Sequence, residues 1–125
     1  MPNDTTNTAK YAVGDADTRP WGKWAVIAAG EGYICKEIVV EPGQILSLQK
    51  HQHRSEHWII LSGIADVTLG EEIIRFSANQ TVFIPRTEKH RIANPGAEPL
   101  RFVEIQVGAI LDENDIERFE DRYGR

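Results

Sequence analysis

Four side chains in this sequence have the types and spacing of a metal site: Gln49, His51, Glu56 and His90. Alternate residues of a β-strand project to the same side, so Gln49 and His51 would point together from a strand. Glu56 follows after a short connection and can fold back to face them. Imidazole nitrogens suit Zn, Fe or Ni, and oxygen ligands extend the range to Mn. We therefore expect one divalent metal ion here, with zinc as the first choice and Mn, Fe, Ni or Co as alternatives.

His90 is the natural fourth ligand because it follows a strand end at residues 84–85 and precedes a turn. The plain alternative is that His51 and His90 line a barrel and are satisfied by ordinary hydrogen bonds, as buried polar groups usually are. Four ligand-type residues at matched intervals favour the metal site over that alternative.

Arg54 lies between two of the expected ligands, after His51 and before Glu56. Its guanidinium can neutralise an oxyanion or hold a phosphate through a bidentate fork. The alternative is a surface salt bridge to Glu56. His53 shares the expected strand face of His51 and can reach the same pocket, unless it is a solvated loop histidine. Arg54 and His53 are therefore two catalytic candidates.

A second polar strand face is expected where Glu104 and Gln106 alternate with apolar residues over 103–107. This face can line a pocket, with Glu104 as a general base, or it can face solvent. Lys36 also alternates with apolar residues and is expected at the surface, with its charged end in water. Glu104 is the third catalytic candidate.

The tryptophans and the arginine-rich end of the chain each allow two interpretations. The tryptophans can stack on a sugar ring, but core packing is favoured in so small a domain. After Asp112, apolar residues at helical spacing predict a short C-terminal helix. Its arginines can form an anion site or belong to a solvated helix face. The residues in question are Trp21, Trp24 and Trp58, then Ile116, Phe119 and Tyr123, and finally Arg118, Arg122 and Arg125.

Short apolar segments separated by turn residues predict an all-β fold, either a sandwich or a barrel. Ser62-Gly63 is expected to close a hairpin between two of these segments. The expected strands span residues 33–40, 45–53, 56–61, 64–69, 73–76, 81–85, 90–94 and 100–107.

Length and charge limit the classes of function. The chain has 125 residues, a formal net charge of −5 and one cysteine, Cys35. The negative charge argues against nucleic-acid binding, which needs a basic surface. The single thiol excludes an internal disulfide and favours the cytoplasm. The longest apolar run, residues 24–29, is too short for a membrane span. Residues 1–18 are polar and predict a flexible N-terminal arm, followed by one domain over residues 19–125.

The metal-site spacing resembles the two sequence motifs of the cupin superfamily. The first motif matches at Gly43, Gln49, His51, Glu56 and Gly63, and the second at Asn79, Pro85, Thr87, His90 and Asn94. Asn79 and Thr87 stand where the motif has glycine. Asparagine accepts the left-handed conformation, whereas Thr87 is expected to change the local turn. The resemblance implies a cupin double-stranded β-helix, which is a jelly-roll barrel, here with a short C-terminal helix.

A closer resemblance covers nearly the whole chain after residue 18. The segments 41–51, 53–58, 104–108 and 115–125, with the opening Arg19-Pro20-Trp21-Gly22, are similar to the cupin domain of type II mannose-6-phosphate isomerases. The family's use of glutamine, two histidines and glutamate implies the same four ligands here. The resemblance also implies a metal-dependent aldose–ketose isomerase that interconverts mannose 6-phosphate and fructose 6-phosphate.

Other functions stay open beside that expectation. A cupin of this size can act on another sugar phosphate, serve as a metal-dependent oxygenase, or bind a sugar or metal without catalysis. The chain has no room for the nucleotide-transferase domain that many type II members carry, so only the isomerase half is expected. Open sheet edges in cupin barrels predict a homodimer. A phosphorylated sugar is the expected partner, and neither nucleic acid nor a membrane is expected.

Overall fold

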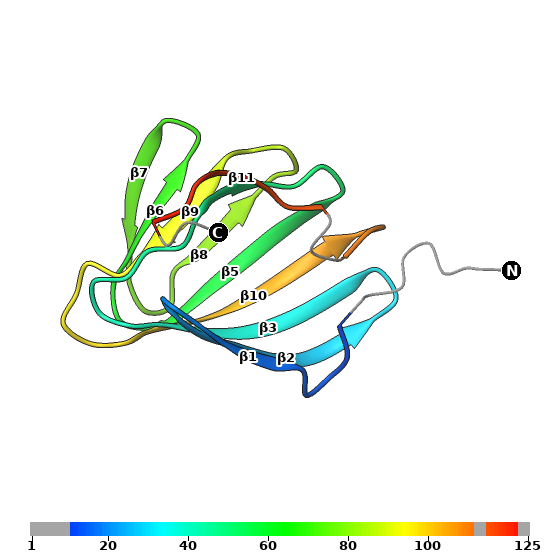
Figure 1. Cartoon of the computed structure of the whole chain (residues 1–125), viewed down its shortest axis with the longest axis horizontal. Coiled ribbons are helices and arrows are strands. Elements are labelled where there is room, and N and C mark those ends of the chain that lie inside the picture. The colour runs from blue at the N-terminus through cyan, green and yellow to red at the C-terminus, as the bar shows by residue number, and fades with distance from the viewer. Residues whose placement is uncertain (1–10, 112–114, 123–125) are drawn as a thin grey trace, which may run out of the picture.

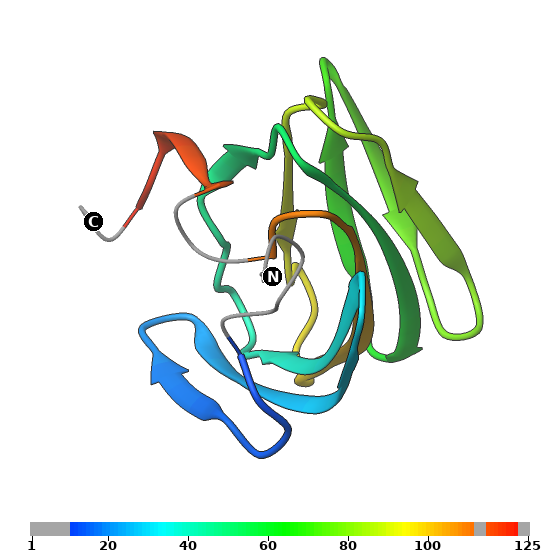
Figure 2. The same ribbon diagram turned by 90° about the vertical axis from the view of Figure 1, so that its right-hand side faces the viewer.

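The computed structural model describes residues 11–111 and 115–122, which form two antiparallel β-sheets that face each other (Figures 1 and 2). The six-stranded sheet has the order β1-β2-β3-β10-β5-β8, and the five-stranded sheet has the order β11-β4-β9-β6-β7. The strands are β1 (Ala16–Arg19), β2 (Gly22–Gly30), β3 (Tyr33–Val40), β4 (Leu48–Lys50), β5 (Arg54–Ser62), β6 (Ala65–Leu69), β7 (Glu72–Phe76), β8 (Thr81–Ile84), β9 (His90–Ala93), β10 (Leu100–Gly108) and β11 (Glu117–Glu120).

Strand β10 shows how one element serves both the core and a cavity. Alternate residues of a strand share a face, and the buried face of β10 carries Leu100, Phe102, Glu104 and Gln106. Leu100 and Phe102 belong to the main hydrophobic core, whereas Glu104 and Gln106 line a cavity. The interior between the sheets therefore changes from apolar to polar along this strand.

The apolar part of the interior holds the two sheets together. Burying a large apolar side chain contributes roughly 1.5–3 kcal/mol, and both sheets supply such residues. Their shared core fixes the sheets against each other at one end, so the polar end has rigid walls. The core residues are Trp21, Ile38, Val40, Trp58, Ile60, Ala65, Val67, Val82, Ile84, Ile92, Leu100 and Phe102.

The all-β prediction is confirmed, and each strand predicted between residues 33 and 107 overlaps an observed strand. The segment 45–53 keeps only β4 and an isolated bridge between Ile45 and Ala93. Strands β1, β2 and β11 were not predicted. The apolar run inside β2 lacks the alternation that distinguishes a half-buried strand.

The predicted hairpin at Ser62-Gly63 is wrong. Strand β5 pairs with β10 and β8, whereas β6 pairs with β7 and β9. The turn therefore carries the chain from one sheet to the other. Gly63 has a φ of 89°, and a Cβ atom there would lie 2.8 Å from the carbonyl oxygen of Pro99. Glycine is needed at this crossing because a side chain would strike the backbone at the start of β10, the strand that pairs with β5.

The predicted C-terminal helix is also wrong, because residues 117–120 form strand β11 along the edge of β4. The backbone groups at that edge need partners, and so short an isolated helix would be marginal in water. Phe119 lies outside the cavity, with Lys89 Nζ 4.2 Å from its ring centroid. The expected cap at Asp112, and Tyr123 and Arg125, lie outside the described residues.

The predicted boundary between arm and domain at Arg19 cuts through β1, which pairs with β2 from Ala16 to Arg19. Order therefore begins before Arg19, and the Tyr11 ring already packs edge-on against Trp24 with a centroid separation of 5.5 Å. Residues 1–10 of the predicted arm lie outside the described part of the chain. Within the described part, no helix has the length and apolar composition needed to cross a bilayer.

In the described part of the chain, two non-glycine residues adopt the left-handed conformation that the cupin motif usually gives to glycine. Asn79 has a φ of 75° and Thr87 a φ of 71°. The expectation that Thr87 changes its turn is therefore wrong. The Thr87 N–H donates to the carbonyl oxygen of His51 at 2.7 Å, so the turn is held by a residue of the metal-site segment. For a β-branched residue this conformation carries strain.

Replacing Thr87 with glycine should raise the stability of the protein. Relief of the left-handed conformation contributes about 1–2 kcal/mol, and the added freedom of glycine in the unfolded chain removes roughly 0.5–1 kcal/mol. We therefore expect Thr87→Gly to raise the free energy of unfolding by about 0.5–1 kcal/mol. Urea unfolding measures the change. Thr81→Gly, in strand β8, is the control and should lower stability. A Thr87→Gly protein that unfolds at a lower urea concentration than the parent would refute the strain argument.

Candidate metal centre

Three of the four predicted ligands converge in the interior. One ligand atom from each of His51, Glu56 and His90 lies within 4.8 Å of the others. Their exposed fractions are 2%, 1% and 4%, respectively. His51 follows β4, Glu56 lies in β5 and His90 begins β9. Both sheets therefore contribute to the cluster, which only their packing brings together.

Hydrogen bonds orient both imidazole rings in the same way. His51 Nδ1 lies 3.2 Å from the carbonyl oxygen of Asp115, and His90 Nδ1 lies 3.0 Å from that of Glu88. A carbonyl oxygen only accepts, so each Nδ1 carries the proton and each Nε2 presents a lone pair. His51 Nε2 lies 3.1 Å from Glu56 Oε2, and His90 Nε2 lies 4.0 Å from Glu56 Oε1. Converging acceptors of this kind suit a cation.

Gln49 lies beside this cluster, because it is paired with His90 between β4 and β9. Its amide nitrogen donates to Ser47 Oγ at 2.6 Å, so its amide oxygen is the atom left for a metal. Gln49 also lines the cavity that contains Glu56 and His90. The chemistry of the four residues fits a divalent cation: two neutral imidazoles, one carboxylate and one amide oxygen.

Arg54 is buried against the cluster, with an exposed fraction of 5%. Its Nε and Nη2 donate to Glu56 Oε2 at 2.9 and 2.8 Å, and Nη2 lies 3.2 Å from His51 Nε2. The alternative of a surface salt bridge is therefore wrong. Trp58 Nε1 donates to the other carboxylate oxygen of Glu56 at 2.8 Å. Both oxygens of Glu56 are thus held in place.

These contacts decide the charge of Glu56. Burial would raise the pKa of this carboxyl, but the positive charge of the buried Arg54 guanidinium holds the pKa well below its usual range. Burial lowers the pKa of His90. An ionised carboxylate beside a neutral imidazole is the protonation state that metal ligation requires.

Glu104 lines the same cavity, but its pKa is shifted in the opposite direction. Burial raises its pKa to about 7, with a further contribution from the negative charge of Glu56. Gln106 Nε2 donates to Glu104 Oε2 at 2.6 Å. Lys36 is paired with Glu104 across β3 and β10, and its Nζ lies 4.1 Å from the centroid of the Tyr11 ring. The expectation that Lys36 is a surface residue is wrong, because it is 8% exposed and lines the cavity.

His53 is not brought to the cavity, contrary to prediction. Strand β4 ends at Lys50, so alternation along a strand no longer fixes the direction of His53. Its side chain is exposed, and its N–H donates to Asp115 Oδ2 at 3.0 Å.

Asp115 is a site residue that the sequence did not indicate. Its carbonyl oxygen accepts from His51 Nδ1, and its carboxylate accepts from the N–H groups of Gln52 and His53 at 3.0 Å each. It therefore orients one candidate ligand and anchors the loop after β4. No local pattern could have revealed it, because His51 is 64 residues away.

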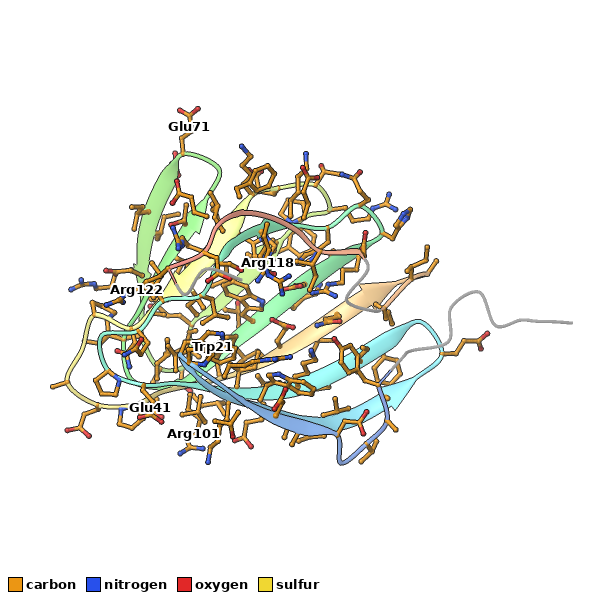
Figure 3. All side chains as sticks on the ribbon, viewed as in Figure 1. Trp21, Glu41, Glu71, Arg101, Arg118 and Arg122 are labelled. Atoms are coloured by element: carbon orange, nitrogen blue, oxygen red, sulfur yellow. The ribbon has the colours of Figure 1, made fainter. Side chains whose placement is uncertain are left out.

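The cavity lies between the sheets, next to the cluster. Its walls contain all three tryptophans, so these residues serve both the core and the cavity. Figure 3 shows Trp21 and Arg118 in the central region, whereas Glu71 and Arg101 lie at the periphery. The lining residues are Tyr11, Arg19, Trp21, Trp24, Lys36, Ile38, Leu46, Ser47, Gln49, Arg54, Glu56, Trp58, His90, Ile92, Phe102, Glu104, Gln106, Ile116 and Arg118.

Comparison with known families gives one match over nearly the whole chain. The model of the family described as "Mannose-6-phosphate isomerase C-terminal" matches residues 6–121. The xanthan biosynthesis protein XanB of Xanthomonas campestris pv. campestris is 51% identical over 107 residues, which are 86% of this chain and 23% of that protein. The alginate biosynthesis protein AlgA of Pseudomonas putida is 50% identical over 86% of this chain and 22% of its own. The mannose-1-phosphate guanylyltransferase ManC of Salmonella typhimurium is 48% identical over the same shares.

Solved structures with the same fold confirm the cupin prediction. An oxalate decarboxylase from Lactobacillus farciminis has a TM-score of 0.73 and 22% identity, covering 84% of this chain and 33% of that chain. A double-stranded β-helix protein from Klebsiella pneumoniae has a TM-score of 0.69 and 18% identity, covering 90% and 91%. At such identities these likenesses show the fold alone. The chain is therefore a cupin double-stranded β-helix, with a C-terminal strand in place of the expected helix.

The comparisons correct the predicted reaction. The chain spans less than a quarter of the curated relatives given above. Their names refer to polysaccharide synthesis and guanylyl transfer, and not to an isomerisation. The assignment of mannose 6-phosphate and fructose 6-phosphate interconversion to this chain was therefore wrong as a statement of its function.

Removal of either cluster histidine should remove the metal. Elemental analysis of the purified protein should find about one metal ion per chain, and much less for His51→Ala and His90→Ala, because each loses an inward-facing imidazole nitrogen. His57→Ala is the matched control, since His57 is exposed and packs against Phe83. Full metal content in both cluster variants would show that the site lies elsewhere.

Asp115→Ala should weaken metal binding without removing a ligand. The variant releases the two N–H groups that follow His51 and so loosens the ring. Loss of such an outer contact typically costs about 10–100-fold in metal affinity. Competition with a coloured chelator measures this affinity, and Asp17→Ala, at an exposed aspartate of β1, is the control. Equal affinities for Asp115→Ala and the parent would mean that Asp115 only anchors the loop.

Proposed function

Because the chain belongs to the mannose-6-phosphate isomerase C-terminal family, we propose that it is a metal-dependent enzyme domain that moves a proton on a phosphorylated sugar. The observation that carries this proposal is the position of Glu104. A buried carboxyl with a pKa of about 7 lines the same cavity as the His51, Glu56 and His90 cluster. Such a carboxyl can both accept and donate a proton near neutral pH.

The metal would be held by His51 Nε2, His90 Nε2, the Glu56 carboxylate and the amide oxygen of Gln49. Zinc is the proposed ion, with Mn, Fe, Ni and Co as alternatives. A bound divalent cation supplies Lewis acidity, which polarises a carbonyl or hydroxyl oxygen of the substrate. The four ligands come from the two sheets, so the ion would also join the sheets at their polar end.

Arg54 has two roles in this proposal, one toward Glu56 and one toward the substrate. Two of its nitrogens donate to one oxygen of Glu56, which keeps that carboxylate ionised and oriented. Its Nη1 makes no hydrogen bond within the described part of the chain, and Arg54 lines the cavity. The same guanidinium can therefore stabilise a substrate oxyanion that develops beside the metal.

Gln106 and Lys36 control Glu104. The amide of Gln106 donates to the carboxylate at 2.6 Å, which fixes its direction. The charge of Lys36 opposes the upward shift that burial produces. Without these two groups, Glu104 would hold its proton to a higher pH and would be a poorer base at neutrality.

Two buried polar atoms in the cavity wall support a ligand with many hydroxyl groups. Trp21 Nε1 and Gln106 Oε1 are buried and have no hydrogen-bond partner among the described residues. One is a donor and the other an acceptor, and leaving such atoms unpaired costs about 1–3 kcal/mol each. Sugar hydroxyls can satisfy both kinds. The predicted homodimer and cytoplasmic location belong to the same proposal and stay predictions.

The proposal is tested by proton exchange rather than by one chosen reaction. The metal-loaded protein is incubated in D₂O with a panel of aldose and ketose phosphates, and NMR follows loss of the proton next to the carbonyl carbon. We expect exchange with at least one sugar phosphate, lost on metal removal. The exchange rate should rise with pH and then level off, because Glu104 is a base only when it is ionised. The midpoint of the rise should lie at or below about pH 7, because a bound cation favours the ionised form.

Glu104→Gln is the matched variant because it keeps the shape but cannot take a proton. It should lower the exchange rate by about 10²–10⁴-fold while metal content is unchanged. Equal exchange by Glu104→Gln would remove Glu104 from the mechanism. Metal binding with no exchange of any sugar in the parent protein would instead indicate a binding module.

A further inference from the structure

We propose that Arg118, on the C-terminal strand β11, binds the phosphate of the substrate at the mouth of the cavity. This rests on the proposed function for the identity of the substrate, but the site itself follows from charge and strand register. As part of β11, Arg118 lies opposite Gln49 in the β4–β11 register.

The register aims Arg118 at the cavity. Residues paired across two antiparallel strands have side chains on the same side of the sheet. Gln49 lines the cavity, and so does Arg118. Their neighbours in the two strands take the opposite side, where Lys50 Nζ lies 3.9 Å from Glu117 Oε1.

Arg118 differs from the other cations of the cavity wall in having no partner among the described residues. Arg54 is bound to Glu56, and Arg19 Nη1 lies 3.2 Å from Asp17 Oδ2. Lys36 lies over the Tyr11 and Trp24 rings. Within the described ranges, 11–111 and 115–122, the Arg118 guanidinium makes no hydrogen bond or ion pair. It is exposed, so an incoming anion can reach it.

The charge of the cavity has the opposite sign to that of the protein. The formal net charge of the chain is −5. Among the described lining residues, however, arginine and lysine supply four positive charges, against Glu56 and Glu104. Glu104 is partly protonated near pH 7, and a divalent ion would add further positive charge. A cleft with this balance concentrates anions within an otherwise acidic protein.

A phosphate is the anion that fits best. The guanidinium fork matches the geometry of a phosphate oxygen pair. Because Arg118 stands beside Gln49 on the neighbouring strand, a phosphate bound there would lie next to the metal ligands but not among them. The carbonyl end of a sugar phosphate could then reach the metal and Glu104 while its phosphate stays at the mouth.

Binding measurements on Arg118→Gln test the proposal. Calorimetric titration compares three probes: a hexose 6-phosphate and the neutral hexose on the metal-loaded protein, and inorganic phosphate on the metal-free protein. We expect Arg118→Gln to bind the two phosphates about 10-fold to 100-fold more weakly, as loss of a charge-assisted hydrogen bond implies. Binding of the neutral hexose should not change. Arg118→Lys keeps the charge but not the guanidinium fork, so its phosphate affinity should lie between those of the parent and Arg118→Gln.

Arg101→Gln is the matched control, because it makes the same change of charge on the outer side of β10, next to Glu37. Equal phosphate affinity in Arg118→Gln and the parent would overturn the proposal. So would an equal loss in Arg101→Gln, which would reflect net charge alone. Unchanged metal content and urea midpoint in Arg118→Gln are expected, and a fall in either would make the residue structural.

The same measurements separate this proposal from the proposed function. If phosphate binding depends on Arg118 but no sugar exchanges a proton, the phosphate site stands and the proposed function fails. If proton exchange occurs and phosphate binding is indifferent to Arg118, the function stands and the site fails.

Discussion

The structure depends on one buried negative charge, the carboxylate of Glu56. Its exposed fraction is 1%, and an uncompensated carboxylate at such a position would cost several kcal/mol. Arg54 and Trp58 donate to its oxygens at 2.8–2.9 Å, and the two histidines face it. A cation bound among these groups would complete the compensation. The polar end of the barrel is therefore organised around keeping this one group ionised without water.

Two buried carboxyl groups in one cavity thereby have pKa values that are shifted in opposite directions. Arg54 bonds directly to Glu56 and lowers its pKa, whereas Glu104 has an amide, Gln106, as its hydrogen-bond donor and keeps a raised pKa of about 7. Environments that separate the pKa values of two acids in this way are typical of sites in which one group stays charged and the other transfers a proton. The negative charge of Glu56 itself contributes to the shift of Glu104, so the two roles are linked.

The last described segment of the chain completes the site from the edge of the five-stranded sheet. Asp115 orients His51 and anchors the loop after β4, and β11 then lies along β4 with Arg118 opposite Gln49. A single segment thus supports a candidate metal ligand and adds a positive charge at the cavity mouth. Loss of this segment would affect both features together, although neither Asp115 nor Arg118 lies in the cupin motifs.

The sequence by itself determined the all-β fold, most strand positions and the residues that form the buried cluster. Alternation and motif spacing are local properties, and the intervals around His51, Glu56 and His90 are written in the chain. Only the tertiary structure decided that Arg54 and Lys36 are buried, that His53 is outside, and that residues 117–120 form a strand. These outcomes depend on which edge of a sheet is free to pair with another strand and on which charged side chains are buried away from solvent. Both are set by contacts between segments as distant as His51 and Asp115, which no local pattern records.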